Sequence, residues 1–323
     1  MDCFPLKGSN DGLRQRVIRA TPTAMKNLIR IATRTSALAR WQAEEVARRL
    51  KANGFESELV PIESDGDIAK SQGFETFGYK GVFTKRIEAA LLDDRADIAV
   101  HSMKDLHSEL PEPLMLGGVL EREDPRDALI SERYASLTDM PKGAVVGTSS
   151  VRRAAIIKHL RPDLIVTEFR GNVPTRLEKL QRGDVDATLL AVAGLKRLGL
   201  SQHITRVMPP EEMLPAVAQG AIGIEQRISD DWITDALNAL NHPPSFDAIS
   251  AERAMLAAID GDCHTPLSGH ARIDGGTLTL TGKWYSPNGE LLAETTQNGN
   301  ACDAISIGNA AGATLLKAQK GNL

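Results

Sequence analysis

The stretch AVVGTSSVRRAAIIKHL, residues 144–160, runs from an apolar strand pattern through a hydroxyl-rich turn into an amphipathic helix pattern. The same succession recurs between residues 28 and 227. Buried strands that alternate with amphipathic helices favour parallel sheets in α/β layers, and this part of the chain is long enough for two such domains. The predicted strands are 28–32, 58–62, 96–101, 144–147, 164–169, 186–190 and 221–225, and the predicted helices are 36–53, 84–94, 150–159 and 173–182.

The pattern changes after Asn241-His242-Pro243-Pro244, which we interpret as a Pro-rich linker. Alternating strand patterns and two helical patterns follow, and together they predict a small α+β domain. Its predicted elements are a helix at 248–259, a loop at 261–266, strands at 277–281 and 291–295 around a turn at 286–289, and a last helix at 304–318.

Charge and composition exclude several classes of protein. The 323 residues carry 38 Lys and Arg against 42 Asp and Glu, so a net charge of −4 provides no general field that attracts nucleic acid. No apolar run reaches the roughly 18–20 residues of a membrane-spanning helix. The three cysteines, Cys3, Cys263 and Cys302, cannot all pair, and free thiols in a reducing compartment are the simplest interpretation. We therefore expect a cytoplasmic protein.

The first 27 residues are expected to be a disordered extension. They are basic and acid-poor but lack the apolar segment of a secretory signal, and a short organellar leader is the alternative.

Three predicted strands end in the same chemistry, with hydroxyl or amide side chains and at least one arginine where a helix begins. Helix N-termini bind anions, and arginine adds a bidentate fork for carboxylate or phosphate. One such junction is explained by an ordinary cap beside a solvated arginine. Three at the carboxyl ends of strands predict a cleft for a ligand with several carboxylates, and no nucleotide-type glycine pattern accompanies them. The junctions are Thr33-Arg34-Thr35-Ser36, Thr148-Ser149-Ser150-Val151-Arg152-Arg153 and Arg170-Gly171-Asn172-Val173-Pro174-Thr175-Arg176.

Two further residues are candidates for chemistry. Asp105 follows the strand at 96–101 beside Lys104, where it would stay ionised and exchange protons with a developing positive centre. A solvated polar turn is the alternative. Cys263 lies in a loop rich in glycine and proline, which favours a reactive or modified thiol over an inert packing cysteine. We predict no metal site, because His101 and His107 are expected to be structural.

Several long motifs in a fixed order resemble the porphobilinogen deaminase family. The resemblance extends from about residue 28 to the C-terminus and is strongest from 96 to 227. The motifs are RIATR (30–34), ADIAVHSMKD (96–105), EREDPRDA (121–128), VGTSSVRR (146–153), RGNVPTR (170–176) and LLAVAGLKRLG (189–199).

The resemblance implies an α/β fold of two periplasmic-binding-protein-like (type II) domains with a cleft between them, plus a small α+β C-terminal domain. The chain would form domain 1 from 28–120 and 221–240, domain 2 from 121–220 and domain 3 from 241–323. It would join four porphobilinogen molecules head to tail into hydroxymethylbilane, releasing ammonia, in tetrapyrrole biosynthesis. A monomer that binds porphobilinogen and the growing polypyrrole chain, without nucleic acid or membrane, is expected.

The same resemblance assigns roles to residues. Asp105 would be the catalytic residue, and Cys263 would carry a dipyrromethane cofactor through a thioether. A mobile lid would correspond to 64–83. The cofactor would be held by Arg34, Ser36, Lys104, Thr148, Ser149, Arg152, Arg153, Arg170 and Arg176, and the substrate by Arg34, Arg170, Arg176, Arg197 and Lys80.

Three positions depart from the family pattern. Asp65 stands where an arginine is usual, and Ala218 stands where glycine is common. Asp262 replaces a glycine before the cofactor cysteine, so its backbone must avoid positive φ. None removes a central catalytic group, so activity is expected.

Two other classes of function are alternatives. A binding or effector-sensing protein of the same bilobed fold would use the arginines without catalysis, but Cys263 and Asp105 argue against it. A DNA-binding regulator is disfavoured by the net charge and by the lack of a basic stripe.

Overall fold

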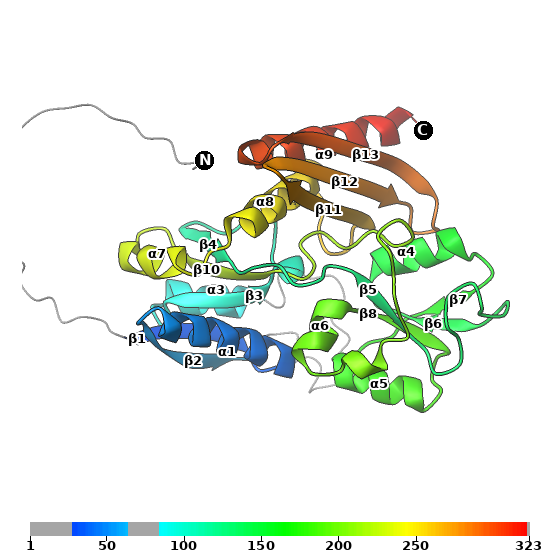
Figure 1. Ribbon diagram of the computed structural model, residues 1–323, viewed down its shortest axis with the longest axis horizontal. Coiled ribbons are helices and arrows are strands. Elements are labelled where there is room, and N and C mark those ends of the chain that lie inside the picture. Colours follow the sequence, from blue (N-terminus) through cyan, green and yellow to red (C-terminus); the bar gives the residue numbers. More distant parts are fainter. Residues whose placement is uncertain (1–27, 64–83, 322–323) are drawn as a thin grey trace, which may run out of the picture.

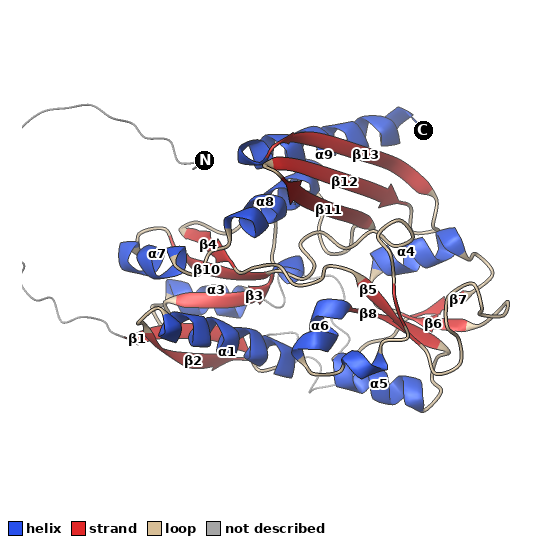
Figure 2. Ribbon diagram, in the orientation of Figure 1, coloured by secondary structure: helices blue, strands red, loops and turns tan. Residues whose placement is uncertain are grey.

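The computed structural model describes residues 28–63 and 84–321, in which strands form three sheets (Figure 1). Two five-stranded sheets belong to two α/β units, and a three-stranded sheet with two helices forms a third unit, as the colouring by secondary structure makes plain (Figure 2). The expected architecture of two α/β domains and a small α+β domain is therefore confirmed. Within the described ranges, no helix combines the length and the apolar character needed to cross a bilayer.

The first sheet has the strand order β2-β1-β3-β10-β4. Strands β1 (Leu28–Arg34), β2 (Glu56–Ile62) and β3 (Ile98–Ser102) are parallel. Strand β10 (Ile222–Arg227) enters between β3 and β4 (Leu114–Val119) and is antiparallel to both. A strand from late in the chain thus lies inside the sheet of the first domain.

Helices α1 (Ala37–Ala52), α3 (Lys85–Leu92) and α7 (Asp231–Asn238) pack on this sheet. Helix α1 begins at Ser36, whose hydroxyl accepts a hydrogen bond from the Ala39 amide at 3.3 Å. It ends before Gly54, whose φ of +86° provides the left-handed residue that closes a helix.

The second sheet has the order β7-β6-β8-β5-β9. Strands β6, β7 and β8 are parallel, whereas β5 is antiparallel to β8 and to β9. Helices α4 and α5 each follow a parallel strand, and α6 follows β8. The elements are β5 (Asp127–Ile130), β6 (Val145–Gly147), α4 (Val151–Leu160), β7 (Ile165–Thr167), α5 (Val173–Gln181), β8 (Ala187–Ala191), α6 (Val192–Arg197) and β9 (Arg206–Val207).

The prediction of parallel sheets is therefore wrong for part of each unit. In the first sheet β10 is antiparallel to both of its neighbours, and in the second sheet β5 is antiparallel to both of its neighbours, whereas the other paired strands are parallel. Apolar strand patterns carry no information on direction, which depends on the side from which the chain arrives.

The third sheet is an antiparallel meander of β11 (Leu267–Asp274), β12 (Thr277–Tyr285) and β13 (Leu291–Asn300). Helices α8 (Pro243–Ala258) and α9 (Ala304–Gly321) pack together on one face. A Cβ at Gly282 would lie 2.5 Å from the sulfur of the buried Met255 of α8, so glycine leaves room for that side chain between α8 and β12.

Two details of this unit differ from expectation. Pro243 and Pro244 are the first residues of α8 and not a linker, because proline fits the first turn of a helix and the His242 side chain caps it. Strand β11 was not predicted. The turn at 286–289 is confirmed by the hydrogen bond from the Gly289 amide to the Ser286 carbonyl at 3.0 Å.

Two chain segments, 120–126 and 208–221, connect the first and second sheets, and a residue of helix α8 forms hydrogen bonds with both segments. The buried carboxylate of Glu252 accepts hydrogen bonds from Arg122 at 2.6 and 3.1 Å and from the Ala218 amide at 2.6 Å. It also accepts one from the Ala271 amide of β11 at 2.7 Å. One side chain thus joins both segments to the third domain.

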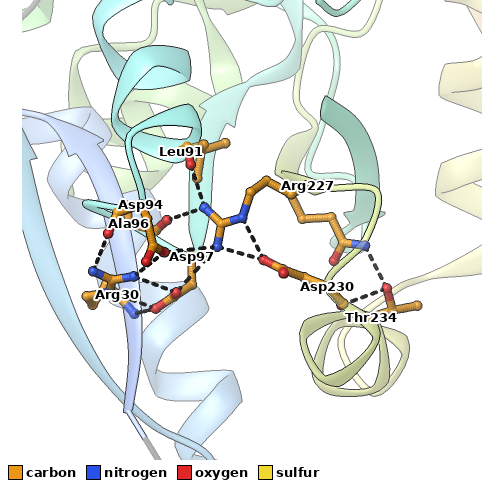
Figure 3. A network of polar contacts seen from close by, with 9 residues as sticks. Arg30, Leu91, Asp94, Ala96, Asp97, Arg227, Asp230 and Thr234 are labelled. Carbon is orange, nitrogen blue, oxygen red and sulfur yellow. Dashed lines mark hydrogen bonds and ion pairs between the residues drawn. The ribbon is translucent and has the colours of Figure 1, made fainter. Parts of the chain in front are cut away.

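At the amino ends of the parallel strands, a network of ion pairs fixes β10 to its neighbours (Figure 3). The carboxylate of Asp97, 1% exposed, binds Arg30 at 2.8 Å and lies 3.5 Å from Arg227. Arg227 also binds Asp230 at 2.6 Å and the carbonyl of Ala96 at 2.8 Å. This network lies at the edge of the sheet opposite Arg34 and Ser102, the ends of β1 and β3.

Candidate active site

A cavity of about 280 Å³ lies where the three domains meet. It is lined by the end of β3, by the first turns of α4 and α5, and by α8 with the loop that follows it. The polar residues of this cavity, called here the main cavity, include Lys104, Asp105, Ser149, Ser150, Arg152, Arg153, Arg176, Gln219, Arg253 and Cys263.

A second cavity of about 70 Å³, called here the side cavity, lies at the carboxyl end of the first sheet. Asp105 lines both cavities, so its carboxylate stands at the boundary between them. The polar residues of the side cavity are Arg34, Ser36, Gln42, Thr84, His101, Ser102 and Asp105.

Two contacts fix the position of Asp105 at this boundary, one from β10 and one from α8. Strand β3 ends in a short 3-10 turn, Met103–Asp105, in which Met103 is buried and Asp105 is exposed. A Cβ at Gly223 of β10 would collide with the Met103 sulfur, so glycine there lets Met103 anchor the turn.

Arg253 of α8 holds the segment immediately after Asp105. Its guanidinium donates hydrogen bonds to the carbonyls of residues 106, 107 and 108 at 3.2, 2.5 and 2.9 Å. Burial lowers the pKa of Arg253 to about 10, well above neutrality, so the group stays charged. Because α8 also leads into the loop that carries Cys263, one helix sets the positions of both Asp105 and the cysteine.

Arg152 and Arg153 have an internal partner that the sequence analysis missed. The carboxylate of Asp127, 0% exposed, accepts a hydrogen bond from Arg152 Nη2 at 2.6 Å and others from Arg153 Nε and Nη2 at 3.0 and 2.7 Å. Burial alone would raise the pKa of Asp127, but the two guanidiniums and Gln219 hold it well below its usual range. An aspartate at the start of an otherwise apolar strand, Asp127–Ile130, was the available signal.

The prediction that the first-turn arginines bind an anionic ligand stays a prediction, and the structure adds an internal partner for Arg152 and Arg153. Asp127 supplies one negative charge against two positive ones, which leaves the pair with a net charge of +1 beside the main cavity. The Nε atoms of Arg152 and Arg176 are buried without a hydrogen-bond partner. Burial and the nearby Arg153 lower the pKa of Arg176 to about 10, so it also stays cationic at neutral pH. Buried donors without a protein partner are the kind of group that a bound water, ion or ligand satisfies.

Lys104 adds a cation whose charge depends on pH. Its Nζ lies 3.4 Å from Gln219 Oε1. Burial lowers the pKa of Lys104 to about 8; Asp105 opposes this shift, and Arg153 and Arg152 add to it. The ammonium is thus largely charged at pH 7 and loses its charge in mildly alkaline solution.

Cys263 is exposed in the loop between α8 and β11, with a free thiol. Asp262 shapes this loop, because its Oδ1 accepts from the His264 amide at 2.8 Å and its own amide donates to Thr265 Oγ1 at 2.9 Å. Asp262 is not among the positive-φ residues of the described chain, as expected. Burial, Asp262 and Asp105 raise the pKa of the Cys263 thiol. The prediction of free thiols is wrong for Cys302, which is disulfide-bonded.

Three of the expected contact residues line neither cavity. Thr148 is buried and accepts a hydrogen bond from the Ser150 amide at 3.1 Å. Arg170 pairs with Glu168 at 2.5 Å. Arg197 donates to the Gly220 carbonyl at 2.6 Å, and burial lowers its pKa to about 10. Lys80, Asp65 and the expected lid at 64–83 lie outside the described residues.

Two family models match the chain. Residues 29–235 match the dipyrromethane cofactor-binding domain of porphobilinogen deaminase, and residues 246–317 match the C-terminal domain of the same enzyme. The chain belongs to the porphobilinogen deaminase family. Members of this family are transferases that make hydroxymethylbilane from porphobilinogen, in porphyrin biosynthesis.

Solved structures that resemble this porphobilinogen deaminase family member include three binding proteins. A putative methionine-binding lipoprotein from Bacillus subtilis is 16% identical, with 67% of this chain and 91% of that chain covered and a TM-score of 0.42. The methionine-binding protein MetQ is 14% identical, with 72% and 94% covered and a TM-score of 0.43. A nutrient-binding protein from Burkholderia cenocepacia bound to methionine is also 14% identical, with 72% and 96% covered and a TM-score of 0.42.

The main cavity suits the cofactor that gives the matched domain its name. Each pyrrole ring of a dipyrromethane carries an acetate and a propionate, so the cofactor requires several cationic partners. The guanidiniums of Arg152 and Arg176, the ammonium of Lys104 and the N-terminus of α4 lie at the main cavity and would provide such partners. The residues present therefore fit the dipyrromethane.

Proposed function

We propose that the protein is an active porphobilinogen deaminase in which Asp105 is the catalytic residue. It would join four porphobilinogen molecules head to tail into hydroxymethylbilane with release of ammonia. The position of Asp105 carries this proposal, because one carboxylate lines both a cavity that contains Cys263 and a separate cavity that contains Arg34. A binding protein has no need for an acid shared by two such compartments.

We further propose that the dipyrromethane is attached through Cys263. Its carboxylates would be held in the main cavity by Lys104, Ser149, Arg152, Arg153 and Arg176. When bound, the cofactor supplies a pyrrole acceptor that is tethered to the protein. The raised pKa of the thiol keeps Cys263 protonated at neutral pH, so attachment requires an electrophilic pyrrole and not merely a reactive thiolate.

The residues around Asp105 divide the work of the reaction. The Asp105 carboxylate faces pyrrole N–H groups and stabilises the positive charge that develops as ammonia leaves porphobilinogen. It then accepts the proton that must leave the pyrrole carbon. Arg34 and Ser36 bind carboxylate from the side cavity. The Arg253 hydrogen bonds keep the carboxylate in place through both events.

The proposed set of contact residues is smaller than the set that the sequence predicted. Thr148 supports Ser150 at the start of α4, whereas Arg170 and Arg197 line neither cavity, so we leave these three residues out of the proposed contact set. The composition of the three sheets supports domain boundaries at 28–120 with 221–240, 121–220 and 241–323. We expect a cytoplasmic monomer.

Intact mass spectrometry with peptide mapping tests the proposal. Freshly purified protein should carry two linked pyrrole units on Cys263, and Cys263→Ala should carry none. Asp105→Asn should keep the adduct but lose turnover by roughly 10²–10⁴-fold. Near-normal turnover of Asp105→Asn would refute the catalytic role. A chain that stays unmodified after incubation with porphobilinogen would favour an anion-binding protein of the same fold.

A further inference from the structure

Within the described residues, a buried hydroxyl beside the side cavity has no hydrogen-bond partner. Thr84 is 3% exposed, and its Oγ1 makes no hydrogen bond within the described structure. Thr84 precedes α3, where a threonine hydroxyl commonly caps the helix, but here the side chain makes no such bond. An unpaired hydroxyl in a buried position costs free energy, so a ligand that satisfies it gains affinity.

Four other polar residues that line the side cavity make hydrogen bonds within the protein. The amide of Gln42 donates to Ser102 Oγ at 2.8 Å, and His101 Nε2 lies 2.9 Å from Glu225 Oε2. The Ser36 hydroxyl caps α1. Within the described structure, Thr84 is therefore the residue of this lining whose buried side-chain oxygen makes no hydrogen bond.

The size of the side cavity limits what can enter. Its volume of about 70 Å³ is roughly half that of an engineered cavity of ~150 Å³ that accepts benzene. A pyrrole ring does not fit inside, whereas a short carboxylate arm does. Asp105 stands on the side shared with the main cavity, so the ring of a ligand whose arm enters the side cavity would lie near that carboxylate.

The charges of the lining favour a carboxylate. The Arg34 guanidinium and the N-terminal end of the 16-residue helix α1 are positive, and Ser36 stands at that helix end. The hydroxyl of Thr84 adds a donor of the kind that carboxylates accept. The negative Asp105 occupies the opposite, shared side, where it suits pyrrole N–H groups.

We propose that Thr84 Oγ1 donates a hydrogen bond to a carboxylate arm of porphobilinogen in the side cavity and so contributes to substrate recognition. This inference rests on the proposed function, since it takes porphobilinogen as the substrate. The arm is either the acetate or the propionate, and the experiment distinguishes them.

The test compares Thr84→Val, which keeps the shape, with Thr84→Ser, which keeps the hydroxyl. The control is Ser268→Ala, because Ser268 Oγ is also buried and unpartnered but lies in β11 outside both cavities. Calorimetry on the purified holoenzyme measures the Kd of a porphobilinogen analogue without the aminomethyl group, which binds without turnover. Michaelis kinetics measure the KM for porphobilinogen.

Thr84→Val should raise both Kd and KM about tenfold, equal to about 1.4 kcal/mol. Thr84→Ser and Ser268→Ala should stay near the wild-type values. Because Thr84→Val removes an unpaired buried hydroxyl, its midpoint of thermal unfolding without ligand should rise by roughly 2–4 °C. A purely structural threonine would give the opposite result, with a lower unfolding midpoint and an unchanged Kd.

Two altered analogues identify the arm. One has an ethyl group in place of the acetate arm, and the other has a propyl group in place of the propionate arm. The Thr84→Val penalty should vanish for the analogue that lacks the carboxylate bound by Thr84. A penalty that persists with both analogues, or a Kd unchanged by Thr84→Val, overturns the inference. Wild-type enzyme that neither binds nor converts porphobilinogen would instead contradict the proposed function.

Discussion

Replacement of Asp127 by alanine should destabilise the protein strongly and empty the main cavity of cofactor. The change removes the acceptor of hydrogen bonds from Arg152 at 2.6 Å, Arg153 at 3.0 and 2.7 Å, and Gln219 at 3.0 Å. The two guanidiniums, 4% and 6% exposed, would remain buried beside each other without a countercharge.

The magnitude follows from this burial. Removal of one partner from a buried, hydrogen-bonded ion pair costs about 3–5 kcal/mol, because the charge that remains is uncompensated. Asp127→Asn preserves the volume and one acceptor oxygen but not the charge, so its cost should lie below that of Asp127→Ala.

Urea unfolding of the three proteins provides the free energies. The matched control is Glu212→Ala, which breaks an ion pair with Arg206 of the same length, 2.6 Å, but with side chains 41% and 35% exposed. Exposed pairs contribute about 0–1 kcal/mol. Intact mass spectrometry of each variant measures the fraction that carries the cofactor, which should fall for Asp127→Ala and stay complete for Glu212→Ala.

A loss below about 1 kcal/mol for Asp127→Ala would refute the reasoning. It would mean that Arg152 and Arg153 find other acceptors or water, and that the main cavity is not organised by a buried aspartate. If Asp127→Ala were destabilised but kept its full cofactor content, the predicted loss of stability would hold and the predicted loss of cofactor would fail. The fold, but not the cofactor site, would then depend on Asp127.

Three further outcomes are expected. Ala218→Gly should leave the free energy of unfolding in urea within about 1 kcal/mol of wild type, because relief of a left-handed residue at φ +59° (roughly 1–2 kcal/mol) is offset by the loss of a buried methyl group (about 0.8 kcal/mol) and by the greater unfolded-chain entropy of glycine (about 0.4–1 kcal/mol); a loss well above 1 kcal/mol would contradict the strain. Arg253→Gln should lower kcat at least tenfold while KM and cofactor content hold, since a misplaced Asp105 costs rate; equal losses in kcat and cofactor would count against a positioning role, and Arg253→Lys should recover part of kcat. Lys104→Met should be more stable than wild type below pH 8, with the difference narrowing between pH 8 and 10.5, because in that window only the unfolded wild type keeps the lysine proton; a difference that does not change with pH would argue against the shifted pKa.

Local patterns predicted most of the secondary structure because they report burial and caps. The helix from Ser36 and the turn at 286–289 depend on residues within a few positions of each other, and both are confirmed. The proline pair at 243–244 misled because proline marks both linkers and first turns, and only the His242 cap decides between them.

The site was harder to predict where it depends on distant partners. The arginines of α4 could be singled out because they stand next to hydroxyl side chains where a predicted strand leads into a helix. Their partner Asp127 lies on strand β5, 25 and 26 residues earlier in the chain. No pattern in the residues around Asp127 predicts this pairing. Arg253 was missed for the same reason, since the carbonyls it binds lie about 145 residues earlier in the chain.

The departure at Ala218 gained a physical meaning only from the structure. The sequence showed alanine where glycine is common, and the backbone there adopts a φ of +59°, which glycine tolerates better. The Ala218 amide donates a hydrogen bond to Glu252 Oε2 at 2.6 Å, and this contact helps to hold the conformation.

The place of β10 inside the first sheet affects the order in which the domains fold during synthesis on the ribosome. Strand β4 has no partner in that sheet until β10 arrives, so domain 1 cannot close its core before residue 227 has been synthesised. The second sheet uses only residues 127–207 and is complete earlier. Domain 2 is thus the first of the two that can finish folding during translation, although the first strands of domain 1 precede it in the sequence. Until β10 is synthesised, the edge of β3 that pairs with it stays unpaired.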